Sequence, residues 1–318
     1  MTRLRRTRPG DAGYRRVRRG RGVGYVDPDG EPVRDPAVLE RVRALAIPPA
    51  WTDVWIAIPE HAHIQATGVD AAGRRQYLYH PAWRVRADRE KFDRMLELAR
   101  VLPGARRAVT RDLRRDELDR DRVLAGAFRL LDSGALRVGS ERYADEHGSD
   151  GLTTLLGAHV RFRENAILLA FPGKSGQVWS SELHDPDLAR LLAQLRRGPR
   201  SRLFAWRGDG RVRVLRAEEI NEDLRRRLGG AFSAKDFRTL RGSAVAARSL
   251  ARAGIASSVS GRRRVVAAAM RDVADALGNT PAVSRASYVD PRIVDRYEHG
   301  EVIDPARAVE PQLVTLLR

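Results

Sequence analysis

The pattern of apolar and polar residues along the chain changes close to residue 88. Over residues 24–83, short apolar runs such as 54–58 alternate with turn sequences such as 70–73, and one helix is expected over residues 36–45. Runs of β-branched and aromatic residues between turns are typical of strands. We therefore predict a small N-terminal domain, rich in β-sheet, over residues 23–88.

After residue 88 the apolar residues recur every three or four positions, which is the spacing of amphipathic helices. The helices expected from this spacing cover residues 88–101, 112–131, 186–196, 217–228, 234–253, 262–277, 290–299 and 305–317. Gly229 and Gly278 are expected to end two of them. Residues 159–171 and 177–183 are of strand type and flank a tight turn. The prediction is an α+β fold in which a larger, mainly helical domain over residues 89–318 carries a small β-hairpin sheet.

The charge of the chain points to a polyanionic partner. Of its 318 residues, 59 are Lys or Arg and 41 are Asp or Glu, so that the formal net charge is +18. Residues 1–22 contain nine arginines, one acidic residue and no apolar face. Such a run is typical of a solvated segment that binds phosphates without sequence preference, and we predict a flexible basic arm over residues 1–22.

The sequence also argues against several kinds of site. The absence of cysteine excludes disulfides, thiol catalysis and cysteine-ligated zinc. No apolar stretch is long enough to span a bilayer and the basic N-terminus lacks a secretory signal, so we expect a cytoplasmic protein with no membrane contact. Residues 173–175 look like the end of a phosphate-binding loop, but Leu168 stands where that loop needs glycine, so no nucleotide is expected. His61, His63 and His80 lack the carboxylate support of a metal site, so no metal or other cofactor is expected.

Lysine is rare among the basic residues of this chain. Only three of the 59 are lysines, namely Lys91, Lys174 and Lys235. Lysine can release a proton near neutral pH when its pKa is lowered, whereas arginine stays charged. A lysine retained in such a chain is therefore a candidate for proton transfer, with chance retention as the alternative.

The strand predicted over residues 74–80 combines basic, amide and aromatic side chains. Gln76 faces one side of it, and Tyr77 and Tyr79 face the other, because side chains alternate along a strand. Glutamine can hydrogen-bond a base edge, and tyrosine can stack on a base or contact a phosphate. We predict that these three residues contact duplex DNA; packing of the tyrosines on the domain's own core is the alternative.

Six short motifs follow one another along the chain. They are WTDVW at residues 51–55, HIQATG at 63–68, GRRQYLYH at 73–80, LRVGSERY at 136–143, KDFRT at 235–239 and SRASY at 284–288. With these motifs the chain resembles bacterial DNA topoisomerase IB, the poxvirus-like type, over roughly residues 24–300. The resemblance implies an isomerase that acts as a monomer, associates with the nucleoid and relaxes supercoiled duplex DNA without ATP or metal.

The resemblance further implies five catalytic residues. They are Arg137, Lys174, Arg238, Asn279 and Tyr288. Asn279 stands where viral and eukaryotic relatives usually carry histidine; an amide cannot transfer a proton there but can still donate a hydrogen bond to a phosphate oxygen. The same match implies that Tyr143 contacts a phosphate near the cleavage site. It also implies that Lys235 lies near the same phosphate, where it either assists proton delivery or only binds the backbone.

The residue types account for the chemistry that the resemblance implies. A tyrosine hydroxyl can attack a phosphodiester and become linked to the 3′ phosphate, while two arginines stabilise the charge that develops on the phosphate oxygens. The expelled 5′ oxygen needs a proton, which a lysine with a lowered pKa supplies better than an arginine. We assign this role to Lys174; no general base for Tyr288 is evident.

Two other classes of protein fit part of the pattern. Tyrosine recombinases or integrases share the Arg, Lys, Arg, Tyr chemistry, but they usually carry histidine where this chain has Lys235. A non-enzymatic nucleoid-binding protein would explain the charge alone. The recombinase would act as a tetramer, and the binding protein would form no covalent adduct with DNA.

Overall fold

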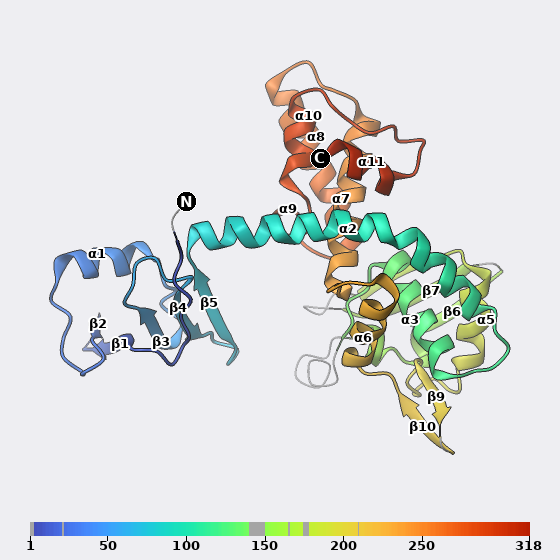
Figure 1. Ribbon diagram of the computed structural model, residues 1–318, viewed down its shortest axis with the longest axis horizontal. Helices are drawn as coiled ribbons and strands as arrows, with labels where there is room; N and C mark the ends of the chain where they lie inside the picture. Colours follow the sequence, from blue (N-terminus) through green and yellow to red (C-terminus); the bar gives the residue numbers. More distant parts are fainter. Residues whose placement is uncertain (1–2, 21, 140–149, 165, 174–177, 209) are drawn as a thin grey trace. The chain divides into compact units, whose positions relative to one another are not determined.

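The computed structural model describes residues 3–20, 22–139, 150–164, 166–173, 178–208 and 210–318. The chain divides into two compact units, Met1–Glu90 and Lys91–Arg318, which are described one after the other. The boundary after Glu90 lies two residues beyond the boundary predicted from the sequence, which is residue 88. Strands dominate the first unit and helices the second, so the predicted α+β fold is confirmed (Figure 1).

The first unit is built on one antiparallel five-stranded sheet with the strand order β2-β1-β3-β4-β5. Its strands are β1 (Gly13–Arg19), β2 (Gly22–Val26), β3 (Thr52–Ala57), β4 (Ile64–Val69) and β5 (Arg75–Tyr79), and its helix is α1 (Pro36–Ala44). The Asp35 side chain caps α1 by accepting from the Ala37 amide, and Pro36 starts the helix with a preset φ. Val42 of α1 packs on Val54 and Ile56 of β3, which forms the core of this unit.

The prediction of a flexible arm over residues 1–22 is wrong, because β1 lies inside it and pairs with both β2 and β3. Gly13 lies against the Trp55 side chain so closely that a Cβ there would come within 2.2 Å of the indole nitrogen. Arg16 donates from Nη1 to the Pro48 carbonyl at 3.1 Å and from Nη2 to the Trp51 carbonyl. A run of arginines therefore joins a sheet when one of them satisfies backbone carbonyls that a loop leaves unpaired.

One of the histidines considered as metal ligands, His63, has structural contacts. The His63 ring accepts a hydrogen bond from the Thr7 amide at 3.1 Å and lies edge-on to Trp83. The described residues contain no group of three or more His, Asp or Glu side chains that could hold a metal ion. None of the helices in the described part of the chain has the length and apolarity that a bilayer crossing requires.

The second unit is mainly helical. Its helices are α3 (Arg120–Gly134), α5 (Pro186–Leu195), α6 (Ala217–Leu228), α7 (Ala234–Ala253), α8 (Val259–Leu277), α9 (Pro281–Ser287), α10 (Pro291–Glu298) and α11 (Val309–Leu316), and most of the long helix α2 (Pro81–Leu113) belongs to it. Strands β6 (Val160–Arg163), β7 (Ala166–Pro172) and β8 (Val178–Leu183) form an antiparallel sheet, and β9 (Ala205–Gly208) pairs with β10 (Arg211–Val214).

The predicted elements of this unit differ from the observed ones where the apolar pattern is short. Helices α6 and α7 have the predicted bounds, and Gly229 and Gly278 end α6 and α8 with positive φ. The stretch 159–171 is two strands separated by a turn at Glu164, and the hairpin β9–β10 was not predicted. The turn that carries Lys174 lies outside the described residues; β7 ends before it at Pro172 and β8 begins after it at Val178.

Helix α7 is the element around which this unit packs. It contacts α3, α8, α10 and α11. Phe237 of α7 packs edge-to-face on Phe128 of α3, with ring centroids 5.3 Å apart, and both rings are buried. Such an aromatic pair adds roughly 1 kcal/mol to the free energy of unfolding beyond the burial of its area. The position of α7 is thereby fixed, and with it the position of every side chain that α7 presents.

The role of Arg16 in the sheet gives a testable prediction. The substitution Arg16→Met keeps the apolar stem and removes the guanidinium, so the loop carbonyls lose their donors and the first unit should lose about 2 kcal/mol of stability. The matched control Arg18→Met changes an exposed residue of the same strand and should have little effect. Hydrogen exchange of the β1 and β3 amides measures both. Equal protection in the two variants would contradict the assigned role.

Candidate active site

Four of the five predicted catalytic residues are described, and they meet beside the N-terminal half of α7. Arg137 Nη2 donates to Asn279 Oδ1 at 2.7 Å, and the Arg238 guanidinium carbon lies 5.1 Å from the centre of the Tyr288 ring. Arg137, Arg238 and Tyr288 line a pocket of about 300 Å³ together with Lys235. Residues up to 151 positions apart in sequence therefore face one small, basic space.

Arg137 follows the C-terminus of α3, in a segment whose backbone is firmly held. Leu136 is buried, and the carbonyl of Arg137 accepts from the Leu152 amide at 2.9 Å. Gly139 adopts a φ of 79°, and a Cβ on it would come within 2.9 Å of the Gly151 backbone. This close approach requires glycine at both positions, and it fixes the direction in which Arg137 leaves the chain.

Arg238 is the buried cation of the site, with 3% of its surface exposed. It donates from Nη1 to the Ala135 carbonyl at 2.6 Å and from Nη2 to the Leu277 carbonyl at 2.7 Å. These carbonyls lie at the C-terminal ends of α3 and α8, where the helix dipoles carry partial negative charge. Burial lowers the pKa of Arg238, and the charge of Arg137 lowers it further. Contact with Tyr288 opposes this shift.

Asn279 is positioned by the end of α8. Gly278 has a φ of 58°, and the Asn279 amide donates to the Ala274 carbonyl at 3.0 Å. A Cβ at Gly278 would come within 2.8 Å of the Trp179 ring of β8, so glycine is needed there for contact as well as for conformation. This turn directs the Asn279 side chain at Arg137 and brings the β7–β8 hairpin against the site.

Tyr288 caps the C-terminus of the short helix α9, and its ring is half-buried. Its carbonyl accepts from Ser243 Oγ at 3.2 Å, and the same hydroxyl accepts from the Asp290 amide at 3.1 Å. A Cβ at Gly242 would come within 2.6 Å of the Tyr288 carbonyl oxygen. Gly242 and Ser243 of α7 therefore hold the backbone of Tyr288, and the sequence analysis missed both.

The charges around Tyr288 change its acidity. Burial alone raises the pKa of a phenol, but the nearby charges of Arg238, Arg137 and Lys235 outweigh it, and the pKa of Tyr288 is lowered. Among the described residues that line the pocket there is no Asp, Glu or His. The positive charges favour the phenolate directly, so this pocket can activate the tyrosine without a general base in contact with it.

Two buried donors of the site have no hydrogen-bond partner among the described residues. They are Arg238 Nε and Asn279 Nδ2. An unsatisfied buried donor costs about 1–3 kcal/mol, and in native structures such donors are completed by ordered water, an ion or a ligand. A ligand suited to this site accepts hydrogen bonds and carries negative charge, since Arg137, Lys235 and Arg238 line the same pocket. A phosphate group meets both conditions.

The site described above does not include the remaining predicted residues. Lys174 and Tyr143 lie outside the described residues. Gln76, Tyr77 and Tyr79 belong to β5 in the first unit. Tyr77 and Tyr79 stack with ring centroids 6.0 Å apart, and Tyr77 is 39% exposed, whereas the Gln76 amide donates to Asp70 at 2.8 Å.

Fold and site define a basic α+β protein with a tyrosine in a pocket lined by Arg137, Lys235 and Arg238. Comparisons with known proteins give the family. Residues 80–300 match the eukaryotic DNA topoisomerase I catalytic core, and residues 22–70 match the bacterial DNA topoisomerase IB N-terminal domain. The chain is 30% identical over 270 residues to DNA topoisomerase 1B of Acanthamoeba polyphaga mimivirus, which covers 82% of this chain and 80% of the viral one. The chain therefore belongs to the type IB DNA topoisomerase family.

Two further relatives are consistent with this membership. DNA topoisomerase 1 of rabbit fibroma virus is 23% identical over 287 residues, covering 85% of each chain. DNA topoisomerase 1 of Mycosarcoma maydis is 26% identical over 221 residues, which is 62% of this chain and 22% of the fungal one. The resemblance seen in the six sequence motifs is thus confirmed, and the recombinase and binding-protein alternatives lose their support.

The contact between α7 and Tyr288 gives the prediction for this site. Ser243→Ala leaves the Tyr288 carbonyl and the Asp290 amide without their shared partner, so the tyrosine shifts. Misplacement of a reacting group by about 1 Å can slow a reaction about a hundredfold. We expect single-turnover DNA cleavage to slow by about tenfold or more while duplex affinity stays unchanged.

The matched control is Ser260→Ala, which removes an exposed serine hydroxyl on α8. It should cleave at the wild-type rate. Duplex affinity, measured by fluorescence anisotropy, separates positioning from binding, and circular dichroism confirms folding. A Ser243→Ala protein that cleaves as fast as the control would show that the hydroxyl does not position Tyr288.

Proposed function

We propose that this type IB DNA topoisomerase relaxes supercoiled duplex DNA through Tyr288. The Tyr288 oxygen attacks the phosphorus of one strand, the bond from phosphorus to the 5′ oxygen breaks, and the phenol becomes linked to the 3′ phosphate. The observation that carries the proposal is the half-buried tyrosine held against Arg238 in a pocket whose buried donors lack partners. Attack of the free 5′ hydroxyl on the phosphotyrosine restores the strand.

Arg137, Arg238 and Asn279 stabilise the transition state in this proposal. Negative charge builds on the non-bridging phosphate oxygens, and one preorganised donor facing such charge is worth about 3–4 kcal/mol. Arg238 Nε and Asn279 Nδ2 are unpaired in the described structure and gain partners only when the phosphate is present. Arg137 already holds the Asn279 oxygen at 2.7 Å, which leaves the amide nitrogen to face the ligand.

Lys174 protonates the departing 5′ oxygen in this proposal. The described residues on either side of its turn, Gly173 and Val178, line a small cavity together with Arg137 and Gly278. The turn therefore begins and ends at the catalytic side of the unit. Positive charge in that region would lower the pKa of a lysine and help it to release a proton. Lys235, which lines the Tyr288 pocket, contacts the DNA backbone beside it.

The energetics explain why we expect no ATP or metal requirement. The phosphotyrosyl bond replaces the phosphodiester bond, so its energy is conserved while the free strand end rotates. Arginine forks supply the charge stabilisation for which other phosphoryl-transfer enzymes use Mg²⁺. We infer that the enzyme acts as a monomer on DNA in the bacterial cytoplasm.

The first unit contributes duplex contacts in this proposal. Tyr77 is exposed and backed by the stacked ring of Tyr79, so it can present a flat, rigid face to DNA. Gln76 contacts DNA only by exchanging its bond with Asp70. Tyr143, from the LRVGSERY motif, completes the predicted contacts on the catalytic side.

One cleavage experiment tests the catalytic assignments. A duplex carries either the normal oxygen or a sulfur at the bridging 5′ position of a mapped cleavage site, in EDTA without nucleotide. A thiol has a pKa of about 8.5 and leaves without needing a proton. Lys174→Ala should be slowed more than a hundredfold on the oxygen substrate and restored to near the wild-type rate on the sulfur substrate. Tyr288→Phe should form no covalent adduct on either.

Each outcome separates one assignment from the other. An adduct formed by Tyr288→Phe would show that another residue is the nucleophile. A Lys174→Ala protein that is equally slow on both substrates would remove the general-acid role and leave Tyr288 untouched. Loss of wild-type cleavage in EDTA would contradict the metal-free mechanism.

The DNA contact of the first unit is tested by binding. Tyr77→Ala should weaken duplex affinity about tenfold, since a hydrogen bond from the tyrosine hydroxyl to a charged phosphate is worth roughly 1.5–3 kcal/mol. The control Val23→Ala alters an exposed residue of β2 in the same sheet and should bind as wild type does. Fluorescence anisotropy at one fixed salt concentration compares them. Equal affinity of the two variants would place the duplex contacts elsewhere.

A further inference from the structure

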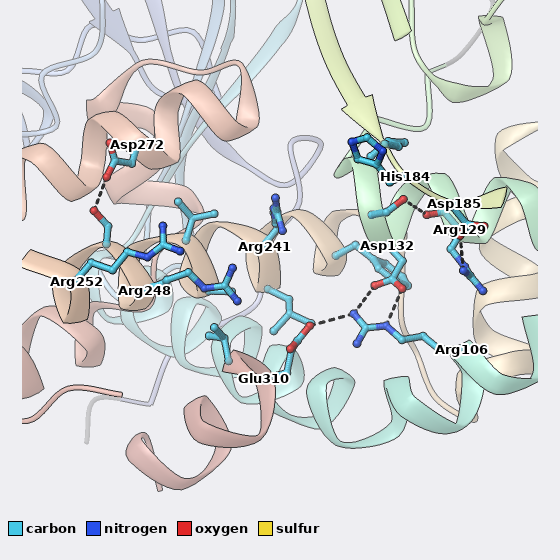
Figure 2. Close-up of a pocket in the computed structure, with 18 of the residues that line it drawn as sticks. Arg106, Arg129, Asp132, His184, Asp185, Arg241, Arg248, Arg252, Asp272 and Glu310 are labelled. Carbon is cyan, nitrogen blue, oxygen red and sulfur yellow. Dashed lines mark hydrogen bonds and ion pairs between the residues drawn. The ribbon is translucent and has the colours of Figure 1, made fainter. Parts of the chain in front are cut away.

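A second, separate basic feature lies along α7. A groove of about 1150 Å³ is lined by α7 together with parts of α2, α3, α8, α11 and the end of β8 (Figure 2). Its lining residues all belong to the second unit. Among the described residues, the lining of the Tyr288 pocket and the lining of this groove share no member. The groove is therefore a different site from the one that carries the chemistry.

The acidic residues of the groove already have partners. Arg106 bridges Asp132 at 2.7 Å and Glu310 at 3.0 Å, and Arg129 pairs with Asp185. Asp272 accepts a hydrogen bond from Ser249. Figure 2 shows these pairs drawn across the groove, and they account for the Asp and Glu side chains of its described lining.

Three arginines of α7 remain without such partners. Arg241, Arg248 and Arg252 line the groove, and among the described residues none of them has an ion pair or a side-chain hydrogen bond. Figure 2 shows them following one another along α7. Their spacing of seven and four residues places them about 10 and 6 Å apart along the helix axis. The groove therefore holds a row of three guanidinium groups without a direct ion pair, and Asp272 is the one carboxylate of its described lining that also has none.

Arg248 is the member of this row that indicates a ligand. The residue is partly buried, and its Nε atom is shielded from solvent without a hydrogen-bond partner. Burial raises the pKa of Glu310. Hydrogen bonds from its own backbone amide and from Arg106 oppose this effect, as do the charges of Arg106 and Arg248, and the pKa is lowered overall. Glu310 is bonded by Arg106 and also feels the charge of Arg248, whose Nε still lacks a hydrogen-bond partner and can donate to an external anion.

The floor of the groove is apolar. Phe237, Leu240 and Val309 line it and are each at most 5% exposed, and Ala244 and Val245 lie half-buried beside them. Ligand pockets of this kind combine apolar walls with a few convergent polar groups, and their volumes are typically about 300–1000 Å³. A bare phosphate chain or a nucleic-acid backbone would leave this floor without a contact.

We propose that this groove binds a small organic anion, in which a phosphate or carboxylate group lies next to an apolar ring or chain. The anionic group contacts Arg241, Arg248 and Arg252. The apolar part covers Leu240, Ala244 and Val245. The site is independent of the DNA chemistry proposed for Tyr288, and binding there requires no covalent step.

The test uses 1-naphthyl phosphate as the probe and the full chain as the protein. Titration calorimetry at fixed ionic strength should show saturable binding of one molecule per groove, and any binding in the Tyr288 pocket is identified as the part that Arg137→Gln removes. Inorganic phosphate, which lacks the ring, and 1-naphthol, which lacks the charge, should each bind at least tenfold more weakly. Arg248→Gln and the exposed Arg241→Gln should each reduce affinity for 1-naphthyl phosphate at least threefold, and the double variant at least tenfold.

Two controls separate this groove from the other basic surfaces. Arg263→Gln alters an exposed arginine of α8 that does not line the groove, and Arg137→Gln alters the Tyr288 pocket. Both should bind the probe with wild-type affinity. Because Arg241 is exposed, its substitution tests the site even if Arg248→Gln misfolds.

The proposal is overturned by any of four results. They are the absence of saturable binding, binding of 1-naphthol as tight as that of the phosphate, loss of binding in Arg137→Gln, and wild-type affinity in the double variant. A fifth result would also overturn the proposal. If a single-stranded oligonucleotide displaces the probe, and the double variant loses as much affinity for the oligonucleotide as for the probe, the groove binds nucleic acid rather than a small molecule.

Discussion

A positive charge is buried in the larger unit without a carboxylate beside it. Arg238 is nearly inaccessible, and its two Nη atoms donate to the carbonyls of Ala135 and Leu277. A buried cation is usually paired, because desolvation of a charge costs several kcal/mol. Here two helix ends supply partial compensation and leave the net positive charge in place. The lowered pKa of Tyr288 and the proposed affinity of the pocket for phosphate both depend on Arg238 having carbonyl rather than carboxylate partners.

The geometry of the site follows from one helix. Lys235 and Arg238 lie one turn apart on α7, and Gly242 and Ser243 lie one further turn along it, against the backbone of Tyr288. The packing of Phe237 on Phe128 fixes the same helix to α3. The proposed nucleophile and one of the arginines proposed to stabilise its attack are therefore positioned by a single rigid element, which suits a reaction that depends on distances of a few tenths of an ångström.

Part of this arrangement could be predicted from the sequence. The bounds of α6 and α7 follow from their apolar spacing and their end signals, and the motifs name Arg137, Arg238, Asn279 and Tyr288. The contact of Ser243 with Tyr288 could not be predicted, because it joins residues 45 positions apart through a hydroxyl and a carbonyl that no periodicity marks.

The strand β1 could not be predicted for a different reason. Its arginines have the pattern of a solvated, charged segment, and the sequence does not show that Arg16 donates to the carbonyls of Pro48 and Trp51. The hairpin β9–β10 was missed because its strands have four residues each, too few for the period-two pattern to stand out.

The ion pairs in the structure distinguish the roles of individual arginines, which the composition cannot do. With 56 arginines in 318 residues, a further arginine carries almost no information in the sequence. In the structure, Arg106, Arg129 and Arg227 are tied to aspartates and hold elements together. Arg41, Arg129, Arg238 and Arg248 each keep a buried Nε unpaired, which destabilises the isolated chain slightly. At Arg238 and Arg248 we propose that an anion relieves that cost, because each lines a pocket beside other arginines that have no ion pair among the described residues.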